Sequence, residues 1–270
     1  VNAKWLGANL TNGGTMDWQD GVINFFSSAT ITNNATWNIT GMNTTSFGDS
    51  YGNVVNSGTI TKSSSGNSDF AYVQTFTNNM GATINCNAGD LRMGGAGNPI
   101  FNNAGALVFN GGMFTLNGNI TFNYNTGTTV SGTGTFNNNG TLSFNGGQFL
   151  GESGVVFNHN PNAIIKGSGT FRMYSLFTNN GIIAPGASPG ILAINWIPQP
   201  FSANSIVDIE VLDNSGPGTG HDQITRTDGG AMSLAGTLNV TESPGVAPGT
   251  FTIITSSTST FSTINLPACY

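Results

Sequence analysis

Short apolar runs, separated by polar turns, recur along the chain, and apolar and polar residues alternate within them. Examples are Thr59–Thr61, Ala82–Ile84, Leu107–Phe109 and Leu142–Phe144. This alternation is typical of strands that bury one face. Gly, Asn and Thr interrupt every stretch in which apolar residues could follow the spacing of a helix. The pattern therefore predicts an all-β chain.

A sequence of 14 residues occurs twice in the middle of the chain. Residues 101–114 read FNNAGALVFNGGMF and residues 136–149 read FNNNGTLSFNGGQF, so 10 of 14 positions are identical at an offset of 35. The segments that follow, 122–135 and 157–170, also align. A fixed internal period is typical of stacked repeat folds. We interpret the 35 residues as two coils of uneven length.

The turns between the predicted strands share the form Phe-x-Asn-x-Gly or a variant one residue longer. In one copy Asn162 replaces the glycine, and both residue types accept a left-handed backbone, so we expect one turn geometry throughout. Stacked coils would align these positions into ladders of identical side chains. The predicted ladder residues are Phe76, Phe101, Phe122, Phe136, Phe157, Phe177, Asn103, Asn138, Asn179, Gly105, Gly140 and Gly181.

These observations favour a parallel β-helix, that is, a solenoid. A β-sandwich or barrel is the alternative, since it also has short strands at regular spacing, but it does not require near-identical sequence at a fixed offset. Three regions are expected. Residues 1–52 hold three of the four tryptophans and form an N-terminal aromatic cap, residues 53–198 are the repeat body, and residues 199–270 form a strand-rich region that closes or extends the solenoid.

Charge is scarce in this chain. Charged residues make up 7% of the sequence, and the net charge is −6 with only six scattered basic residues. Without a basic stripe we expect no nucleic-acid partner. No apolar run reaches 18 residues, so we expect no membrane insertion. Cys86 and Cys269 lie far apart in the sequence without metal-ligand spacing, which predicts two isolated thiols.

One segment resembles a known family. Residues 181–192, GIIAPGASPGIL, are similar to the G-x-I-x-P-G-x-S-P-G-x-L signature of β-helical passenger regions in bacterial autotransporters and related surface-exported proteins. SIVDIEVL at 205–212 and PGTFTIITSSTSTF at 248–261 follow in the same order, and the resemblance covers about residues 55–267. It implies a right-handed β-helix that is exported and displayed at the bacterial cell surface. Adhesins, aggregation factors and some enzymes share this stalk, so the resemblance does not specify an activity.

Candidate catalytic residues are few. Gly186–Gly190 matches the G-x-S-x-G pattern of hydrolases, but Pro189 follows the serine and has no N–H for an oxyanion hole, so we predict a structural turn. His159 aligns with Tyr124 in the repeat, which favours a surface or stacking position. His221 lies in a glycine-rich loop. No catalytic residue is predicted.

Calcium is the one cofactor that the sequence suggests. The densest carboxylates are Asp208, Glu210, Asp213 and Asp222, and oxygen-rich clusters bind calcium. Their spacing matches no defined calcium loop. A solvated acidic strand face is the favoured interpretation, and no other cofactor is expected.

Polysaccharide lyases also use β-helices, with acidic residues beside a lysine or arginine. Arg92, Lys166 and Arg172 could serve with Asp90 and Glu152, and Lys166 and Arg172 are expected on adjacent coils.

The preferred hypothesis is a non-enzymatic, extracellular bacterial surface protein that acts as a stalk, an adhesin or a self-assembling fibre subunit. Its expected partners are other copies of itself and cell-surface or matrix polysaccharide. The alternative is a β-helix that binds or degrades polysaccharide.

Overall fold

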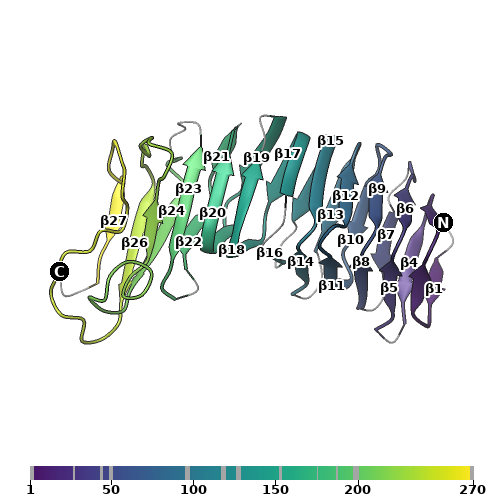
Figure 1. Cartoon of the computed structure of the whole chain (residues 1–270), viewed down its shortest axis with the longest axis horizontal. Helices are drawn as coiled ribbons and strands as arrows, with labels where there is room; N and C mark the ends of the chain where they lie inside the picture. Colours follow the sequence, from purple (N-terminus) through teal and green to yellow (C-terminus); the bar gives the residue numbers. More distant parts are fainter. Residues whose placement is uncertain are drawn as a thin grey trace.

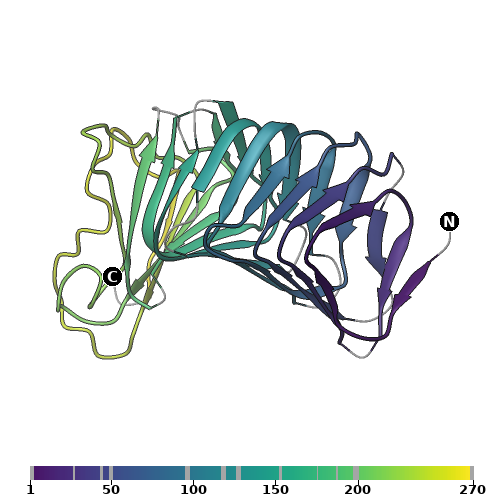
Figure 2. The same cartoon turned by 45° about the vertical axis from the view of Figure 1, so that its right-hand side comes forward.

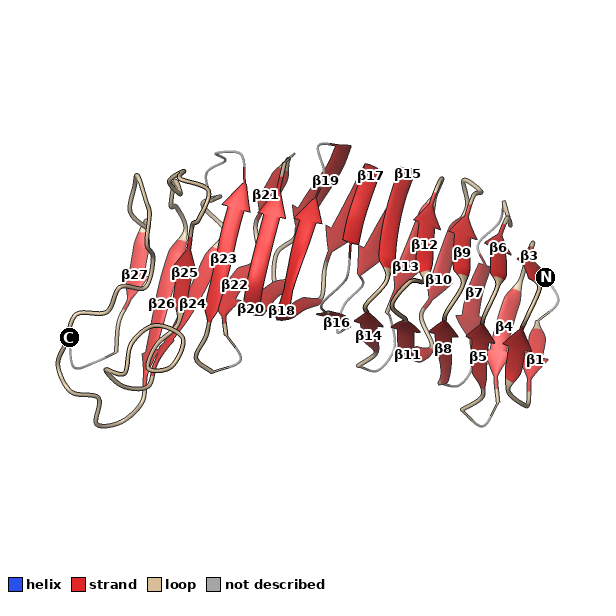
Figure 3. Cartoon of the chain, viewed as in Figure 1, coloured by secondary structure: helices blue, strands red, loops and turns tan. Residues whose placement is uncertain are grey.

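The chain is a stack of parallel strands. The computed structural model (Figures 1 and 3) describes residues 3–26, 28–42, 45–48, 51–94, 98–116, 120–125, 129–151, 154–174, 176–186, 188–196 and 201–267. Within these ranges the strands form a β-solenoid of about 10 turns, without a helix. The predicted all-β parallel solenoid is confirmed, and the sandwich alternative is wrong. These ranges contain no helix that could span a membrane.

Most coils have three sides, which we name faces A, B and C (Figure 2). Face A consists of β1 (Lys4–Leu6), β4 (Val22–Phe25), β7 (Thr45–Gly48), β10 (Asn67–Phe70), β13 (Asp90–Met93), the second parts of β15 (Ala106–Leu116) and β17 (Thr129–Asn138), β19 (Gly154–His159) and β21 (Phe177–Asn179).

Face B consists of β2 (Leu10–Asn12), β5 (Thr30–Asn33), β8 (Gly52–Asn56), β11 (Val73–Asn78), β14 (Ile100–Asn103), β16 (Thr121–Tyr124), the first parts of β18 (Thr141–Gly151) and β20 (Ile164–Met173), β22 (Ile182–Pro185), β24 (Ile206–Val211), β26 (Thr237–Glu242) and β27 (Thr263–Asn265). Face C consists of β3 (Thr15–Trp18), β6 (Thr36–Ile39), β9 (Thr59–Lys62), β12 (Thr83–Cys86), the first parts of β15 and β17, the second parts of β18 and β20, β23 (Ile191–Trp196) and β25 (Gln223–Thr225).

The sequence repeat is longer than one coil. Phe101 pairs with Phe122, 21 residues later, and Ile60 pairs with Ile84, 24 residues later. An offset of 35 therefore spans one coil and part of the next, and Phe136 lies on face A whereas its counterpart Phe101 lies on face B. The prediction that 35 residues make two coils is wrong. The sequence repeat therefore describes a strand with the corner that follows it, and this unit occurs on more than one side of the coil.

The predicted phenylalanines are buried and stack in two columns instead of one. Phe76, Phe101 and Phe122 follow one another on face B, with ring centroids 4.7 and 4.6 Å apart. A second column on face A contains Phe114, Phe136, Phe157 and Phe177. The columns meet inside the coil, where the centroids of Phe122 and Phe136 are 6.1 Å apart. Offset and edge-to-face ring pairs at these separations stabilise the core beyond the burial of apolar area.

Buried asparagines also form a column, on face B. Each side-chain amide donates to the amide oxygen of the next asparagine at 2.7 to 2.8 Å. The members are Asn12, Asn33, Asn56, Asn78 and Asn103. The first three also donate to the carbonyl oxygens of Thr36, Thr59 and Thr83, which lie just after the corner in the next coil. The column therefore satisfies polar groups at the corners, which would be costly to bury without partners.

The corner glycines serve two purposes. In the longer turn variant Gly81 (φ 83°) and Asn162 (φ 67°) adopt the predicted left-handed backbone. In the shorter variant the prediction is wrong, because Gly105 and Gly181 have no such φ. A Cβ at Gly105 would lie 2.4 Å from the carbonyl oxygen of Ala82 in the coil below. Glycine is required there because two backbones approach closely.

The N-terminal aromatic residues lie on coils that belong to the stack. β1 to β7 pair in parallel with the following coils. Trp18, Phe25 and Trp37 are buried in the coil interior, whereas Trp5 is 62% exposed at the N-terminal end. At the other end β24, β26 and β27 extend face B, and longer loops connect them (Figure 1).

Candidate functional site

The carboxylates predicted as calcium ligands serve mainly as hydrogen-bond acceptors. Asp222 is buried and accepts the backbone N–H groups of Gly190 (2.8 Å) and Glu210 (2.9 Å). Burial raises the pKa of Asp222, and these two bonds oppose the shift. Glu210 accepts the Ser188 hydroxyl at 2.6 Å. Asp208 accepts the amide of Asn239 at 2.8 Å. The group thus ties adjacent coils and loops together.

Asp213 lies apart from the other three, in a loop. It accepts the backbone N–H of Ser215 at 2.7 Å, and the side-chain and backbone groups of Ser215 lower the pKa of Asp213. Across the described residues no three His, Cys, Asp or Glu side chains are arranged to hold a metal ion. The calcium site suggested by the sequence therefore has no set of converging ligands in this structure.

A shallow depression of about 260 Å³ lies on the outer surface of face B. Its lining includes Lys166, Ser188, Asp208, Glu210 and Asp222. Strand register brings Lys166 next to Ala184 and Ala184 close to Asp208, so a lysine and three carboxylates line one open depression. Such a surface can hydrogen bond a hydroxylated or charged polymer.

Within the G-x-S-x-G match, Ser188 and Pro189 form a bend, and the strand β23 follows; Ala187 lies outside the described residues. Ser188 has φ 122°, and its hydroxyl donates to Glu210. Among the described residues no histidine contacts this hydroxyl, so the arrangement lacks the base that activates the serine of a hydrolase triad.

The basic residues proposed for a lyase do not gather. Lys166 and Arg172 both lie on β20 and not on adjacent coils as predicted. The guanidinium of Arg172 lies over the ring of Tyr174 at 4.6 Å. Arg92 pairs with Asp90, at 2.8 Å. The remaining candidate, Glu152, lies outside the described residues.

His159 is buried, with 0% exposure, so of the two predicted positions the surface one is wrong and the stacking one agrees with the structure. Its Nδ1 lies 3.1 Å from the side-chain nitrogen of Asn138 and its Nε2 lies 3.0 Å from the carbonyl oxygen of Ile182. Because an amide nitrogen can only donate and a carbonyl can only accept, the ring is neutral with the proton on Nε2. Burial lowers the pKa of His159 to about 4. The imidazole ring of His159 thus hydrogen bonds to the coils on both sides, as the asparagine side chains do in the column of face B.

Asn138, His159 and Asn179 form this second, shorter column on face A. The backbone N–H groups of Gly140 and Gly181 donate to the side-chain oxygens of Asn138 (3.1 Å) and Asn179 (3.2 Å). The predicted asparagine ladder is therefore divided, because Asn103 belongs to face B.

Lys62 and Cys86 form a pair that no sequence motif predicts, and they stack inside the coil. Lys62 is 0% exposed, and its Nζ donates to the carbonyl oxygen of Ser64, to its hydroxyl (2.8 Å) and to Ala88 (3.5 Å). Burial lowers the pKa of Lys62 and raises the pKa of the Cys86 thiol to about 12. The alternation in Thr59–Lys62 is the sequence signal that indicates the burial of Lys62, because Ile60 and Lys62 share the inner face. Cys86 is unpaired, and Cys269 lies outside the described residues.

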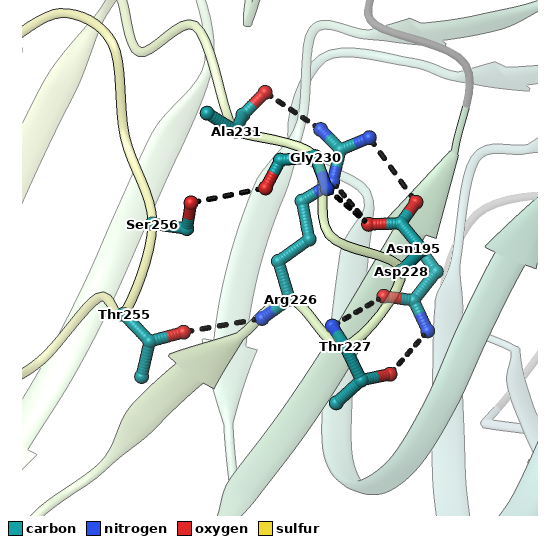
Figure 4. Close-up of polar contacts among 8 residues, drawn as sticks. All are labelled: Asn195, Arg226, Thr227, Asp228, Gly230, Ala231, Thr255 and Ser256. Atoms are coloured by element: carbon teal, nitrogen blue, oxygen red, sulfur yellow. Dashed lines mark hydrogen bonds and ion pairs between the residues drawn. The ribbon is translucent and has the colours of Figure 1, made fainter.

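A buried arginine organises the loop after β25 (Figure 4). The side chain of Arg226 is 3% exposed; its Nε donates to Asp228 at 2.6 Å and its Nη1 to the carbonyl oxygen of Ala231 at 2.7 Å. Asn195 and Thr227 hydrogen bond each other twice, both at 2.9 Å. No pattern in the sequence predicts this cluster, because Arg226 and Asp228 are separated by one residue in a segment without strand alternation.

Comparison with known proteins adds no relative. No protein-family model matches the chain, and a search of curated proteins found no significant match.

Proposed function

We propose that this protein is a structural rod of an extracellular bacterial surface protein, a stalk or fibre subunit without enzymatic activity. The observation that supports the proposal is the solenoid of about 10 turns, with buried side-chain columns along its axis among the described residues. Ten parallel turns at the usual strand spacing give a length of roughly 45 Å. Every coil hydrogen bonds to its neighbours along that axis, which suits an element that spans a distance.

The low charge supports association between rods. With 7% charged residues, two copies that meet side by side or end to end repel each other weakly. The resemblance of residues 181–192 to the passenger regions of surface-exported proteins supports the extracellular location and the bacterial surface.

Both ends of the described stack expose strand edges and apolar side chains. At the N-terminal end β1, β2 and β3 pair on one side only in the described structure, around an open depression of about 460 Å³ lined by Trp5, Leu10 and Trp18. At the C-terminal end Ile264 and Leu266 are more than half exposed. Unpaired strand edges recruit other strands, so both ends favour head-to-tail association.

Sedimentation velocity and light scattering over a concentration series test this association. We expect the average mass to rise with concentration and to fall back toward the monomer in Leu10→Lys. Met80→Lys is the matched control, since Met80 is exposed on a coil corner. A monomer at every concentration for the unmodified chain, with no filaments by electron microscopy, would exclude a self-assembling fibre.

Polysaccharide degradation is the second candidate, and the depression around Lys166, Asp208 and Glu210 is the observation that favours it. A lyase acting on uronic-acid polymers produces an unsaturated product that absorbs ultraviolet light. Turnover that disappears in Lys166→Ala would replace the rod proposal with an enzymatic one.

A further inference from the structure

The chain contains six asparagines that directly precede a glycine, at positions 12, 110, 117, 139, 145 and 180. Because glycine has no side chain to shield its backbone nitrogen, this nitrogen can attack the side-chain amide carbon of the asparagine. The reaction requires a glycine N–H that is not held by a hydrogen bond and an asparagine side chain that is free to turn. Residue 117 and the side chain of residue 145 lie outside the described part of the chain, and the other four pairs have different surroundings.

The pair of Asn110 and Gly111 lies at the corner of β15 between faces C and A, and both residues are exposed. The strand pairings of β15 skip Gly111. On one side the register with β17 passes from Asn110 directly to Met113. On the other side the pairing with β12 ends at Phe109, and the pairing with β13 begins at Met113. The peptide group of Gly111 is therefore not held in the register of either neighbouring coil.

The space around this corner is open. A carbon added to Gly111, which has a left-handed backbone (φ 99°), would meet a single atom within 4 Å, the carbonyl oxygen of Asn87 at 3.6 Å. The equivalent corner of β18 has the same form, with Gly146 at φ 79° and no atom within 4 Å of its added carbon. The side-chain amide of Asn110 donates to the amide oxygen of Asn87 at 2.8 Å, and because this bond is exposed, water can replace it at little cost.

The pairs that begin at residues 139 and 180 are protected by the asparagine column of face A. The N–H of Gly140 donates to the side-chain oxygen of Asn138 at 3.1 Å, and the N–H of Gly181 donates to that of Asn179 at 3.2 Å. Both glycines are buried, so an attack by either nitrogen requires the corner to open first. Asn12 is protected in another way, because its own amide nitrogen is bonded within the buried column of face B.

We propose that Asn110 is a site of spontaneous deamidation, with water as the only co-reactant. The backbone nitrogen of Gly111 forms a bond to Cγ of Asn110, the bond from Cγ to Nδ2 breaks, and ammonia leaves with the proton of the Gly111 N–H. Water then adds to one of the two carbonyl groups of the cyclic imide and opens the ring. The product is an aspartyl residue or its isoaspartyl isomer, according to which carbon–nitrogen bond breaks, and no oxidant or reductant is needed.

The modification changes the outer surface of the rod at one defined place. Each event adds one negative charge, which takes the net charge from −6 to −7. A carboxylate has no N–H to donate, so the exposed hydrogen bond from position 110 to Asn87 of the adjacent coil is lost. The isoaspartyl form also adds a methylene group to the main chain of the corner. The proposal is independent of the rod function, because it depends only on this corner and its exposure to solvent.

Peptide mapping by mass spectrometry tests the proposal on the whole chain. The protein is kept at pH 8 and body temperature for several weeks, and samples are digested at acidic pH, where the reaction is slow. We expect the modified form to accumulate at Asn110 at least about tenfold faster than at Asn139 and Asn180, because the latter two react only after their corners open. In a chain unfolded by urea the three asparagines should react at similar rates, since no structure protects any of them.

Two variants complete the experiment. Asn110→Gln keeps an amide at the corner but would have to form a larger ring, so we expect no modification there. Asn138→Ala removes the acceptor of the Gly140 N–H, and we expect faster modification at Asn139. If Asn138→Ala does not fold, the comparison of the three sites in the unmodified chain decides. Equal rates at the three sites in the folded chain, or an unmodified Asn110 while the unfolded chain reacts, would overturn the proposal.

Discussion

At the scale of single residues, the corners of the coil determine which residue types are accommodated at many positions. The alternation of apolar and polar residues correctly predicts which positions point inward, and the six phenylalanines of the predicted ladder are buried as expected. The alternation also places His159 and Lys62 on the inner face, but the polarity of these two side chains argues against burial. In the structure the His159 ring and the Lys62 ammonium group each hydrogen bond a backbone carbonyl oxygen of the next coil. The sequence alone does not show where these carbonyl oxygens lie.

The buried His159 makes stability depend on pH. Its pKa is about 4 in the folded chain and near 6.5 when unfolded, so the folded state binds fewer protons between these values. Stability is therefore complete above pH 6.5 and falls as the pH drops toward 4, by about 3 kcal/mol. Urea unfolding of the unmodified chain and of His159→Asn at pH 8 and pH 4.5 measures this. Asparagine keeps the column without a titrating ring, so its loss should be smaller. Equal losses of stability in the unmodified chain and in His159→Asn would contradict the assignment of this pH dependence to His159.

Gly105 should not tolerate a side chain. In Gly105→Ala the new Cβ would lie 2.4 Å from the carbonyl oxygen of Ala82, so the two coils must separate locally. We expect the free energy of unfolding to fall by about 1–3 kcal/mol, as in other overpacked sites. Gly14→Ala is the control, because no atom lies within 4 Å of its added carbon. Chemical denaturation gives both values, and similar stability of the two variants would show that the corner is not closely packed.

At the scale of strands and corners, the repeat identifies the building unit but not its position in the coil. Phe101 and Phe136 have the same sequence surroundings, yet they lie on faces B and A. The sequence identity shows that the two segments form the same strand and corner. Such a strand and corner can form on any of the three sides of the coil. The number of sides depends on the loop lengths between strands, and the chain varies these from coil to coil. The asparagine ladder is divided for the same reason.

One asparagine in the middle of a column should matter for several coils. Asn56 receives a hydrogen bond from Asn33 and donates one to Asn78, both at 2.8 Å. Asn56→Asp keeps the size but replaces the donating nitrogen with a buried negative oxygen, and we expect about 2–4 kcal/mol of destabilisation at pH 7. Asn110→Asp is the control, since its contact with Asn87 is exposed. Differential scanning calorimetry compares the two, and equal melting temperatures would show that the column does not stabilise the rod.

The loop that contains Arg226 is held by an ion pair with Asp228 in addition to its other hydrogen bonds. Asp228→Asn preserves the shape of the side chain and leaves the guanidinium of Arg226, which is 3% exposed, without its anionic partner (Figure 4). Because Asp228 is partly exposed to solvent, we expect a modest loss of about 1–2 kcal/mol. Limited proteolysis should then cut between residues 226 and 231. Asp17→Asn, at an exposed carboxylate, should leave the digestion pattern unchanged, and an uncut loop in Asp228→Asn would mean that the other contacts suffice.

At the scale of the whole molecule, the fold is a stack in which each coil contacts only its neighbours. Stability in such a stack is a sum over coils and interfaces, so the ends open before the middle. The two ends differ. β1, β2 and β3 complete a three-sided coil, whereas face A has no described strand after β21, and faces B and C continue with longer connecting loops. The sequence predicted a change of character near residue 199 but not which side of the coil stops.

Hydrogen exchange followed by mass spectrometry can measure this gradient. We expect the slowest exchange in the middle coils, from β14 to β19, where each strand is paired on both sides and the two phenylalanine columns meet. Exchange should accelerate toward both ends and more steeply toward the C-terminal end, since β27 is exposed and pairs with β26 alone in the described structure. Head-to-tail association would slow exchange at β1 to β3 and β27 as concentration rises, and leave the middle coils unchanged. Equal protection from exchange in all coils at low concentration would contradict a stability that is a sum over coils. Protection of β1 to β3 and β27 that does not change with concentration would contradict association through the ends.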